Sequence, residues 1–212
     1  MKNNEIPLLP ETIYHIYNHA NGNENLFLNN ENYLYFLKRY AFFIQPIAHT
    51  YAYCLMPNHL HLVVKVKDEK QLQEANIYFQ QMKNIAPSNI KLLEANEVGS
   101  FVSKVFGNLF SAYSQSFNKQ QGRRGSLFMP NFKRKIIDNE AYYAKLIFYI
   151  HNNPVHHGFV SSMDARPFSS YKTFLSDSPT KISKQEVMDW FGTTDEFVRF
   201  HKTEKIDSSF EL

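Results

Sequence analysis

Two histidines, one residue apart, interrupt the apolar and β-branched run MPNHLHLVV at residues 56–64. In a β-strand, side chains alternate between the two faces, so His59 and His61 point to one side while the leucines beside them point to the other. A turn-forming Pro-Asn pair before His59 separates this run from another apolar run at 49–55. The pattern predicts a hairpin of strands near 49–55 and 59–67, with one face of the second strand available for chemistry.

The histidine pair has two interpretations. It can be structural, with two half-buried imidazoles hydrogen-bonded to their neighbours. It can also be functional, which requires a third polar ligand and a reactive group supplied by a separate element. His15, Tyr17 and His19 alternate along a predicted first strand at 12–19, but no spacing rule links them to the pair, and we leave them out of the candidate site.

A helix predicted over 140–152 supplies the missing groups. Tyr149 and Asn153 lie four residues apart and share one face, with Lys145 one turn earlier. A tyrosine on a helix usually belongs to the core, whereas a tyrosine, an amide and a lysine on one stripe are harder to explain by packing. We therefore treat this stripe as a second candidate group.

Helical periodicity also predicts a helix over 29–45, a weaker one around 72–85 and one over 101–118. Asp138 or Asn139 can cap the 140–152 helix, and the Asn153–Pro154 pair is expected to close it. Two short helices are expected near the C-terminus, where capping-box patterns occur and Gly192 separates them; these patterns are Ser183 with Glu186 and Thr193 with Glu196.

Positive charge is concentrated in residues 101–160, which contain eight Lys and Arg against two Asp and Glu. Such an excess can be an ordinary solvated face, or it can contact the phosphates of a nucleic acid. The candidate DNA-binding residues lie in a glycine-flanked loop, in the FKRK segment and on the helix that carries the tyrosine; they are Arg123, Arg124, Lys133, Arg134, Lys135 and Lys145.

Composition limits the cellular setting. The sequence has no apolar run long enough to span a membrane, and its first residues, MKNNEIPLLPE, do not resemble a signal peptide. Its single cysteine, Cys54, excludes an intramolecular disulfide and fits a reducing compartment. We expect a cytoplasmic protein that does not engage membranes.

Four motifs in order resemble a known family. They are MPNHLH (56–61), GSLF followed by FKRK (125–135), YIHNNPVHHGFV (149–160) and PFSSY (167–171). Together they resemble the HUH single-tyrosine transposases, and within these the REP-associated tyrosine transposases. The resemblance extends from about residue 12 to 175 and is much more specific than the histidine pair alone.

The resemblance implies an α+β, ferredoxin-like (βαββαβ) fold, in which an antiparallel sheet has helices on one face. It implies a catalytic domain at 1–175, and we expect 176–212 to form a small helical C-terminal extension packed on the same domain. By position, His59 and His61 match the metal-binding pair, Tyr149 the nucleophile and Asn153 the third metal ligand. Asn152 departs from the family pattern, in which an apolar residue precedes Asn-Pro.

The implied activity is that of a metal-dependent single-stranded DNA endonuclease and transposase, which cleaves and rejoins DNA near hairpin (palindromic) sequences through a 5′-phosphotyrosine. The cofactor would be Mg²⁺ or Mn²⁺, with no nucleotide cofactor, and the protein would act as a monomer or a homodimer. A free phenol has a pKa of about 10, so Tyr149 would need the cation or Lys145 to help it lose its proton.

Two alternatives predict different chemistry. A domesticated, non-catalytic nucleic-acid-binding protein would share the basic segment but would not need Tyr149. A metal-dependent phosphoesterase that uses water as the nucleophile would need further carboxylate or histidine ligands near the hairpin, and the sequence offers none there. Because every matched catalytic position is filled, we favour the transposase interpretation.

Overall fold

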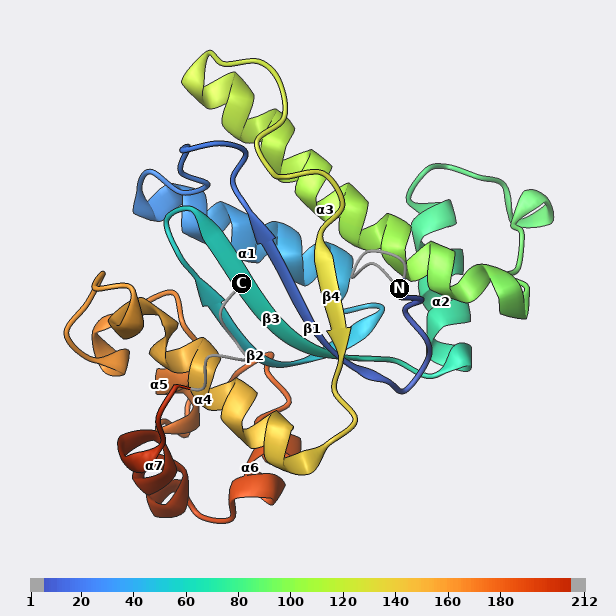
Figure 1. The fold of residues 1–212 in the computed structure, drawn as a ribbon. Coiled ribbons are helices and arrows are strands. Elements are labelled where there is room, and N and C mark those ends of the chain that lie inside the picture. The colour runs from blue at the N-terminus through green and yellow to red at the C-terminus, as the bar shows by residue number, and fades with distance from the viewer. Residues whose placement is uncertain (1–5, 207–212) are drawn as a thin grey trace.

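The computed structural model describes residues 6–206. Four strands form one antiparallel sheet in the order β2-β3-β1-β4 (Figure 1). The strands are β1 (Ile13–His19), β2 (Ala48–Leu55), β3 (His59–Val66) and β4 (Lys133–Ile136). With helices between β1 and β2 and between β3 and β4, this order confirms the predicted α+β, ferredoxin-like βαββαβ core.

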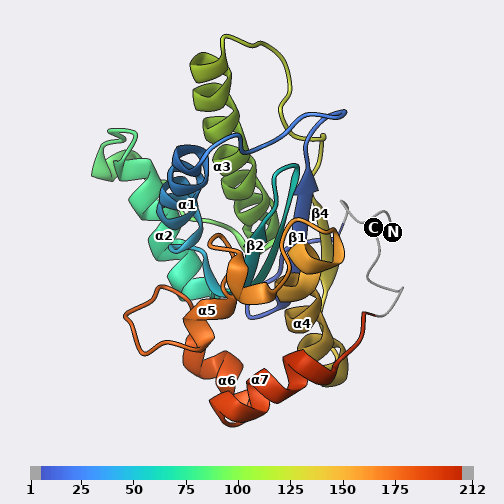
Figure 2. The same ribbon diagram turned by 90° about the vertical axis from the view of Figure 1, so that its left-hand side faces the viewer.

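Helices cover the first face of the sheet (Figure 2). They are α1 (Asn30–Ile44), α2 (Glu69–Gln81) and α3 (Val98–Gln121), and short 3₁₀ turns at Pro87–Asn89 and Ala95–Glu97 connect the last two. Leu60, Leu62 and Val64 of β3 project into this core, where they meet apolar residues such as Phe36 and Leu109. The alternation predicted for the histidine strand therefore holds on its apolar side.

The helices of the predicted ferredoxin-like core lie on the first face, and further helices cover the second face as well. Helix α4 (Glu140–His156) crosses this face after β4, and it is followed by a 3₁₀ turn at Met163–Ala165 and by α5 (Tyr171–Phe174) (Figure 1). Tyr51, Cys54 and Val63 of the sheet are buried there in a second apolar cluster. Because both faces of the sheet carry apolar side chains, the second face also has to be removed from water.

Helix α4 continues one turn beyond the predicted end at residue 152. Pro154, the residue predicted to close the helix, lies inside it. Pro154 removes one N–H from the helix, but the carbonyls beside it still accept from later residues. Asn153 O accepts from His157 N at 3.0 Å, and Val155 O accepts from Gly158 N at 3.0 Å. At the other end, Asn139 rather than Asp138 is the N-cap; its Oδ1 accepts from Tyr142 N at 3.1 Å.

Two further helices, α6 (Lys184–Phe191) and α7 (Thr194–Thr203), end the described chain. Val187 of α6 and Phe197 of α7 are fully buried in the cluster that α4 helps to form. The capping box at Thr193 is confirmed, whereas the one predicted at Ser183 is wrong, because no side-chain bond caps α6.

Residues 1–5 of the predicted catalytic domain and 207–212 of the predicted extension lie outside the described residues. Within residues 6–206, no helix has both the length and the apolar character needed to cross a membrane.

Candidate functional site

The site lies between β3 and α4, on the face of the sheet opposite Leu60 and Leu62. His59 and His61 both project to this side, and they are only 5% and 0% exposed. They contribute to a pocket of about 510 Å³ that the ends of β1 and α4 complete. Its lining residues are His19, Asn58, His59, His61, Tyr149, His156, His157 and Phe159.

The structure brings together the four residues predicted for the catalytic centre. His59 Nε2 and Asn153 Oδ1 are 2.9 Å apart, although 94 residues separate them in the sequence. The ring of Tyr149 meets that of His61 edge to face, with 5.5 Å between centroids and 83° between planes. Lys145 is half-buried one turn earlier on α4, and the pocket lining among the described residues does not include it.

Burial keeps the two histidines neutral. It lowers the pKa of His59 to about 4, against a smaller opposing effect of the hydrogen bond with Asn153. Burial also lowers the pKa of His61 well below its usual value, and the nearby His15 acts in the same direction. Each ring therefore has an unprotonated nitrogen at neutral pH, as a metal ligand requires.

Four further histidines belong to this region. Sequence reasoning left His15 and His19 out of the site and did not single out His156 and His157. In the antiparallel register His19 lies opposite His59, and the two rings stack with centroids 4.9 Å apart. His15 Nε2 is 2.9 Å from His61 Nδ1, and the His157 ring lies 5.4 Å from that of His59. The alternation of His15 and His19 on one strand could have indicated that they share a face. Only the register between β1 and β3 places that face beside His59 and His61.

The donor set fits a divalent cation held by His59, His61 and Asn153. His61 Nε2 is buried with no hydrogen-bond partner in the described part of the chain, and so is Asn153 Nδ2. Nitrogen and amide oxygen are accepted ligands of Mn²⁺, and oxygen is preferred by Mg²⁺. No group of three or more His, Cys, Asp or Glu within residues 6–206 is arranged to hold a metal, so such a site depends on the amide as third ligand.

The fold has a solved counterpart. The structure of a REP-associated tyrosine transposase bound to a REP hairpin matches this chain with a TM-score of 0.55 and 15% sequence identity, over 84% of this chain and 89% of that one. The chain has the fold of a REP-associated tyrosine transposase. No family model and no curated protein sequence matches it.

The basic residues predicted to bind DNA occupy different environments on this transposase fold. Lys133 and Lys135 are exposed on β4, and in the register they lie opposite Tyr17 and His15 of β1, on the histidine side of the sheet. Arg134 between them points to the opposite side and is only 7% exposed. Its guanidinium donates to Ser103 Oγ of α3 at 2.6 Å and lies over the Phe132 ring.

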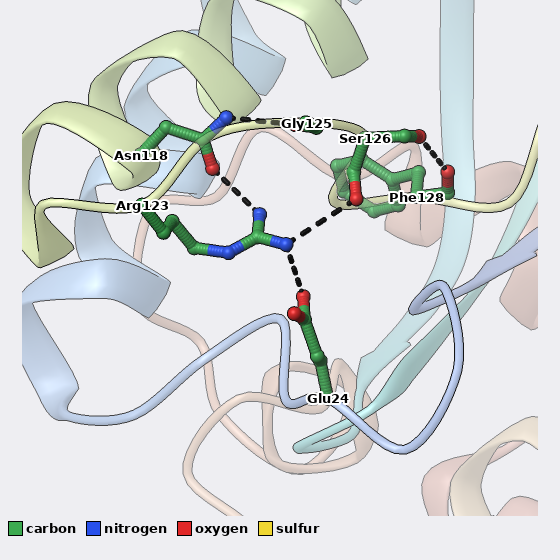
Figure 3. Close-up of polar contacts among 6 residues, drawn as sticks. All are labelled: Glu24, Asn118, Arg123, Gly125, Ser126 and Phe128. Carbon is green, nitrogen blue, oxygen red and sulfur yellow. Dashed lines mark hydrogen bonds and ion pairs between the residues drawn. The ribbon is translucent and has the colours of Figure 1, made fainter.

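The two arginines of the glycine-flanked loop also differ. Arg124 is exposed, whereas Arg123 forms an ion pair with Glu24 and donates to Asn118 Oδ1 at 2.6 Å (Figure 3). The same guanidinium reaches Ser126 O at 3.4 Å, and Asn118 Nδ2 donates to Gly125 O at 2.9 Å. Arg123 therefore ties the loop after α3 to the loop after β1, a structural role that the sequence pattern did not reveal.

Proposed function

We propose that this protein is a metal-dependent single-stranded DNA endonuclease and strand transferase, which cleaves and rejoins DNA beside hairpins through a 5′-phosphotyrosine. The observation that carries the proposal is the position of Tyr149. Its ring packs on His61, in the pocket that His59 also lines. His59 Nε2 in turn lies 2.9 Å from Asn153 Oδ1. A tyrosine beside a neutral histidine pair and an amide is suited to attack a phosphate that the same group holds.

The roles follow from the positions of the side chains. His59, His61 and Asn153 would hold Mg²⁺ or Mn²⁺, which when bound polarises the scissile phosphate and neutralises its charge. The Tyr149 oxygen forms a bond to phosphorus while the bond from phosphorus to the 3′-oxygen breaks. The phenol loses its proton, and the 3′-oxygen gains one to leave as a free hydroxyl. Another 3′-hydroxyl can reverse the reaction, so strand transfer needs no nucleotide cofactor.

The proposed substrate is single-stranded DNA that contains a hairpin. The solved transposase of the same fold is bound to a REP hairpin. On this chain the exposed cations Lys133 and Lys135 lie on the histidine side of the sheet, where phosphates that approach the pocket would meet them. Because one chain supplies Tyr149, His59, His61 and Asn153, a monomer contains the whole proposed site.

The proposal is tested by adduct formation. The purified protein is incubated with Mn²⁺ and a set of 5′-labelled and 3′-labelled DNA hairpins with single-stranded flanks, and the products are separated on a denaturing gel. We expect a protein–DNA adduct that retains the 3′-label, and a released fragment that ends in a 3′-hydroxyl. Chelation of the metal should abolish both products.

Three variants separate the proposed function from its alternatives. Tyr149→Phe and His59→Ala should both lose the adduct, whereas Tyr142→Phe, on the same helix but outside the pocket lining, should retain it. Cleavage that survives Tyr149→Phe would mean that water is the nucleophile. Hairpin binding without any adduct, across the whole set and with either metal, would favour a non-catalytic DNA-binding protein.

A further inference from the structure

A buried contact between two strands involves the second histidine of the pair. His15 of β1 and His61 of β3 place Nε2 and Nδ1 2.9 Å apart, and their rings stack with 5.2 Å between centroids and 24° between planes. The side chains are 3% and 0% exposed, so water does not compete for this hydrogen bond. The contact is diagonal in the sheet, since His15 pairs with Val63 and His61 with Tyr17.

One of these two nitrogens must carry the hydrogen, and the choice decides what His61 can bind. If His15 donates, a neutral His61 carries its hydrogen on Nε2, where no acceptor from residues 6–206 meets it. A buried N–H without an acceptor is costly, and it cannot bind a cation. If His61 donates from Nδ1, its Nε2 is instead an unprotonated ligand atom beside Tyr149.

The first histidine of the pair has an oxygen partner at each ring nitrogen. His59 Nδ1 lies 2.8 Å from Asn58 Oδ1, and His59 Nε2 lies 2.9 Å from Asn153 Oδ1. A neutral imidazole has one N–H, so it can donate to only one of these two oxygens at a time. When a cation is bound by Nε2 and Asn153 Oδ1, the hydrogen is on Nδ1, where Asn58 accepts it.

We propose that His15 is a positioning residue that fixes His61 in the tautomer protonated on Nδ1, so that Nε2 is available to the metal. Asn58 accepts from Nδ1 of His59 in the same way when a cation occupies the site, whereas His15 orients His61 before a cation arrives. Outer partners of this kind fix the tautomer and ring orientation of metal-binding histidines and increase metal affinity. The inference deepens the proposed function, since it assigns a role beside the same metal site.

The tautomer is tested directly on the metal-free protein. In a sample with ¹⁵N-labelled histidine at pH 7.5, two-bond ¹⁵N–¹H correlation spectra distinguish the protonated ring nitrogen from the bare one, and the signals lost in His61→Gln assign His61. We expect Nδ1 of His61 to be protonated and Nε2 to be bare. A hydrogen on Nε2 would overturn the proposal, whether or not the protein cleaves DNA.

The effect on metal affinity is measured by Mn²⁺ titration, followed by electron paramagnetic resonance of the free ion. His15→Phe should weaken Mn²⁺ binding about 10- to 100-fold. His15→Gln, whose side-chain oxygen can accept from His61 Nδ1, should recover part of that loss. His49→Phe is the matched control on β2, outside the pocket, and should bind Mn²⁺ like the unchanged protein.

Unfolding curves of all variants show whether any loss reflects the site alone. Equal Mn²⁺ affinity in folded His15→Phe and in the unchanged protein would overturn the positioning role. If the unchanged protein binds no Mn²⁺, the metal of the proposed function fails, while the spectra still decide the tautomer. If His15→Phe does not fold, two measurements still decide the proposal. They are the Mn²⁺ affinity of His15→Gln relative to the unchanged protein, and the position of the His61 hydrogen in the spectra.

Discussion

Consecutive cations on β4 have different roles because the strand turns them to opposite sides. Lys133 and Lys135 are exposed on the side that carries the histidines, whereas Arg134 is buried against Ser103 and Phe132. Net charge in the sequence cannot distinguish them, since all three contribute equally to the basic segment. The structure therefore separates residues that would contact DNA from one that holds the edge strand to α3.

A matched pair of substitutions tests this separation. Lys135→Gln should weaken binding to single-stranded DNA and reduce the slope of log affinity against log salt by about 1, because one phosphate contact is lost. Its free energy of unfolding should remain within about 0.5 kcal/mol of the unchanged protein, as is usual for surface sites. Fluorescence anisotropy at several salt concentrations, together with urea unfolding, provides both measurements.

Arg134→Gln should show the reverse pattern. Loss of the buried guanidinium leaves Ser103 without its charged partner, and the free energy of unfolding should fall by about 1–3 kcal/mol. The salt slope for DNA binding should stay unchanged. A reduced slope with unaltered stability would instead place Arg134 on the DNA.

At the scale of elements, α4 carries the proposed nucleophile and depends on its cap for a fixed start. Asn139 Oδ1 accepts from Tyr142 N. Tyr149 and Asn153 lie about two and three turns after Tyr142 on the same helix. Both Asp138 and Asn139 have cap-forming side chains, so sequence alone left the choice open. The backbone decides it, because Asn139 has the extended conformation and helical residues begin at Glu140.

Substitution of the cap should affect stability without touching the pocket. Asn139→Ala should lower the free energy of unfolding by about 1 kcal/mol, because one amide at the start of α4 loses its acceptor. Asp138→Ala is the neighbouring control and should change it by less than about 0.5 kcal/mol. Equal losses in the two variants, measured by chemical unfolding, would contradict the assignment of the cap.

The elements were largely predictable because periodicity depends on local sequence. The alternation at 59–66 and the stripe that joins Tyr149 to Asn153 both follow from residues a few positions apart. Contacts across the sheet were not predictable in this way. His19 meets His59 through strand register, and Arg123 meets Glu24 across 99 residues, so neither contact leaves a spacing pattern in the sequence.

At the scale of the whole molecule, a buried polar chain links the C-terminal helices to the core. Phe197 O can only accept, so His201 Nδ1 donates to it at 2.9 Å, and His201 Nε2 accepts from His151 Nδ1 at 3.0 Å. His151 Nε2 then accepts from Ser170 Oγ at 2.8 Å. The chain joins α7, α4 and the start of α5, and these directions hold for neutral histidines, the form that burial favours by lowering the pKa of both groups.

This chain makes stability depend on pH. Burial lowers the pKa of His201 to about 4 and that of His151 well below its usual value, whereas both groups titrate near 6.5 in the unfolded chain. The unfolded state therefore binds more protons below that pH. The stabilisation is complete above about pH 6.5 and is lost as the pH falls from about 6.5 towards 4.

Removal of one titrating group should reduce this dependence. Over that interval, His201→Gln should lower the slope of unfolding free energy against pH by up to about 1.4 kcal/mol per pH unit, the value for one proton. Urea unfolding at pH 7, 6, 5 and 4.5 gives the slope, which is independent of any constant loss caused by the substitution. An unchanged slope would mean that His201 is protonated in the folded protein.

The burial of Tyr149 has a steric consequence for what can reach it. The side chain is 3% exposed in a pocket lined by four histidines beside His61, two of them from the end of α4. In the proposed function the scissile phosphate has to enter this pocket, which a single flexible strand can do by bending, whereas a stiff duplex resists such bending. Selection for unpaired DNA would then come from the shape of the entrance, before any base is recognised.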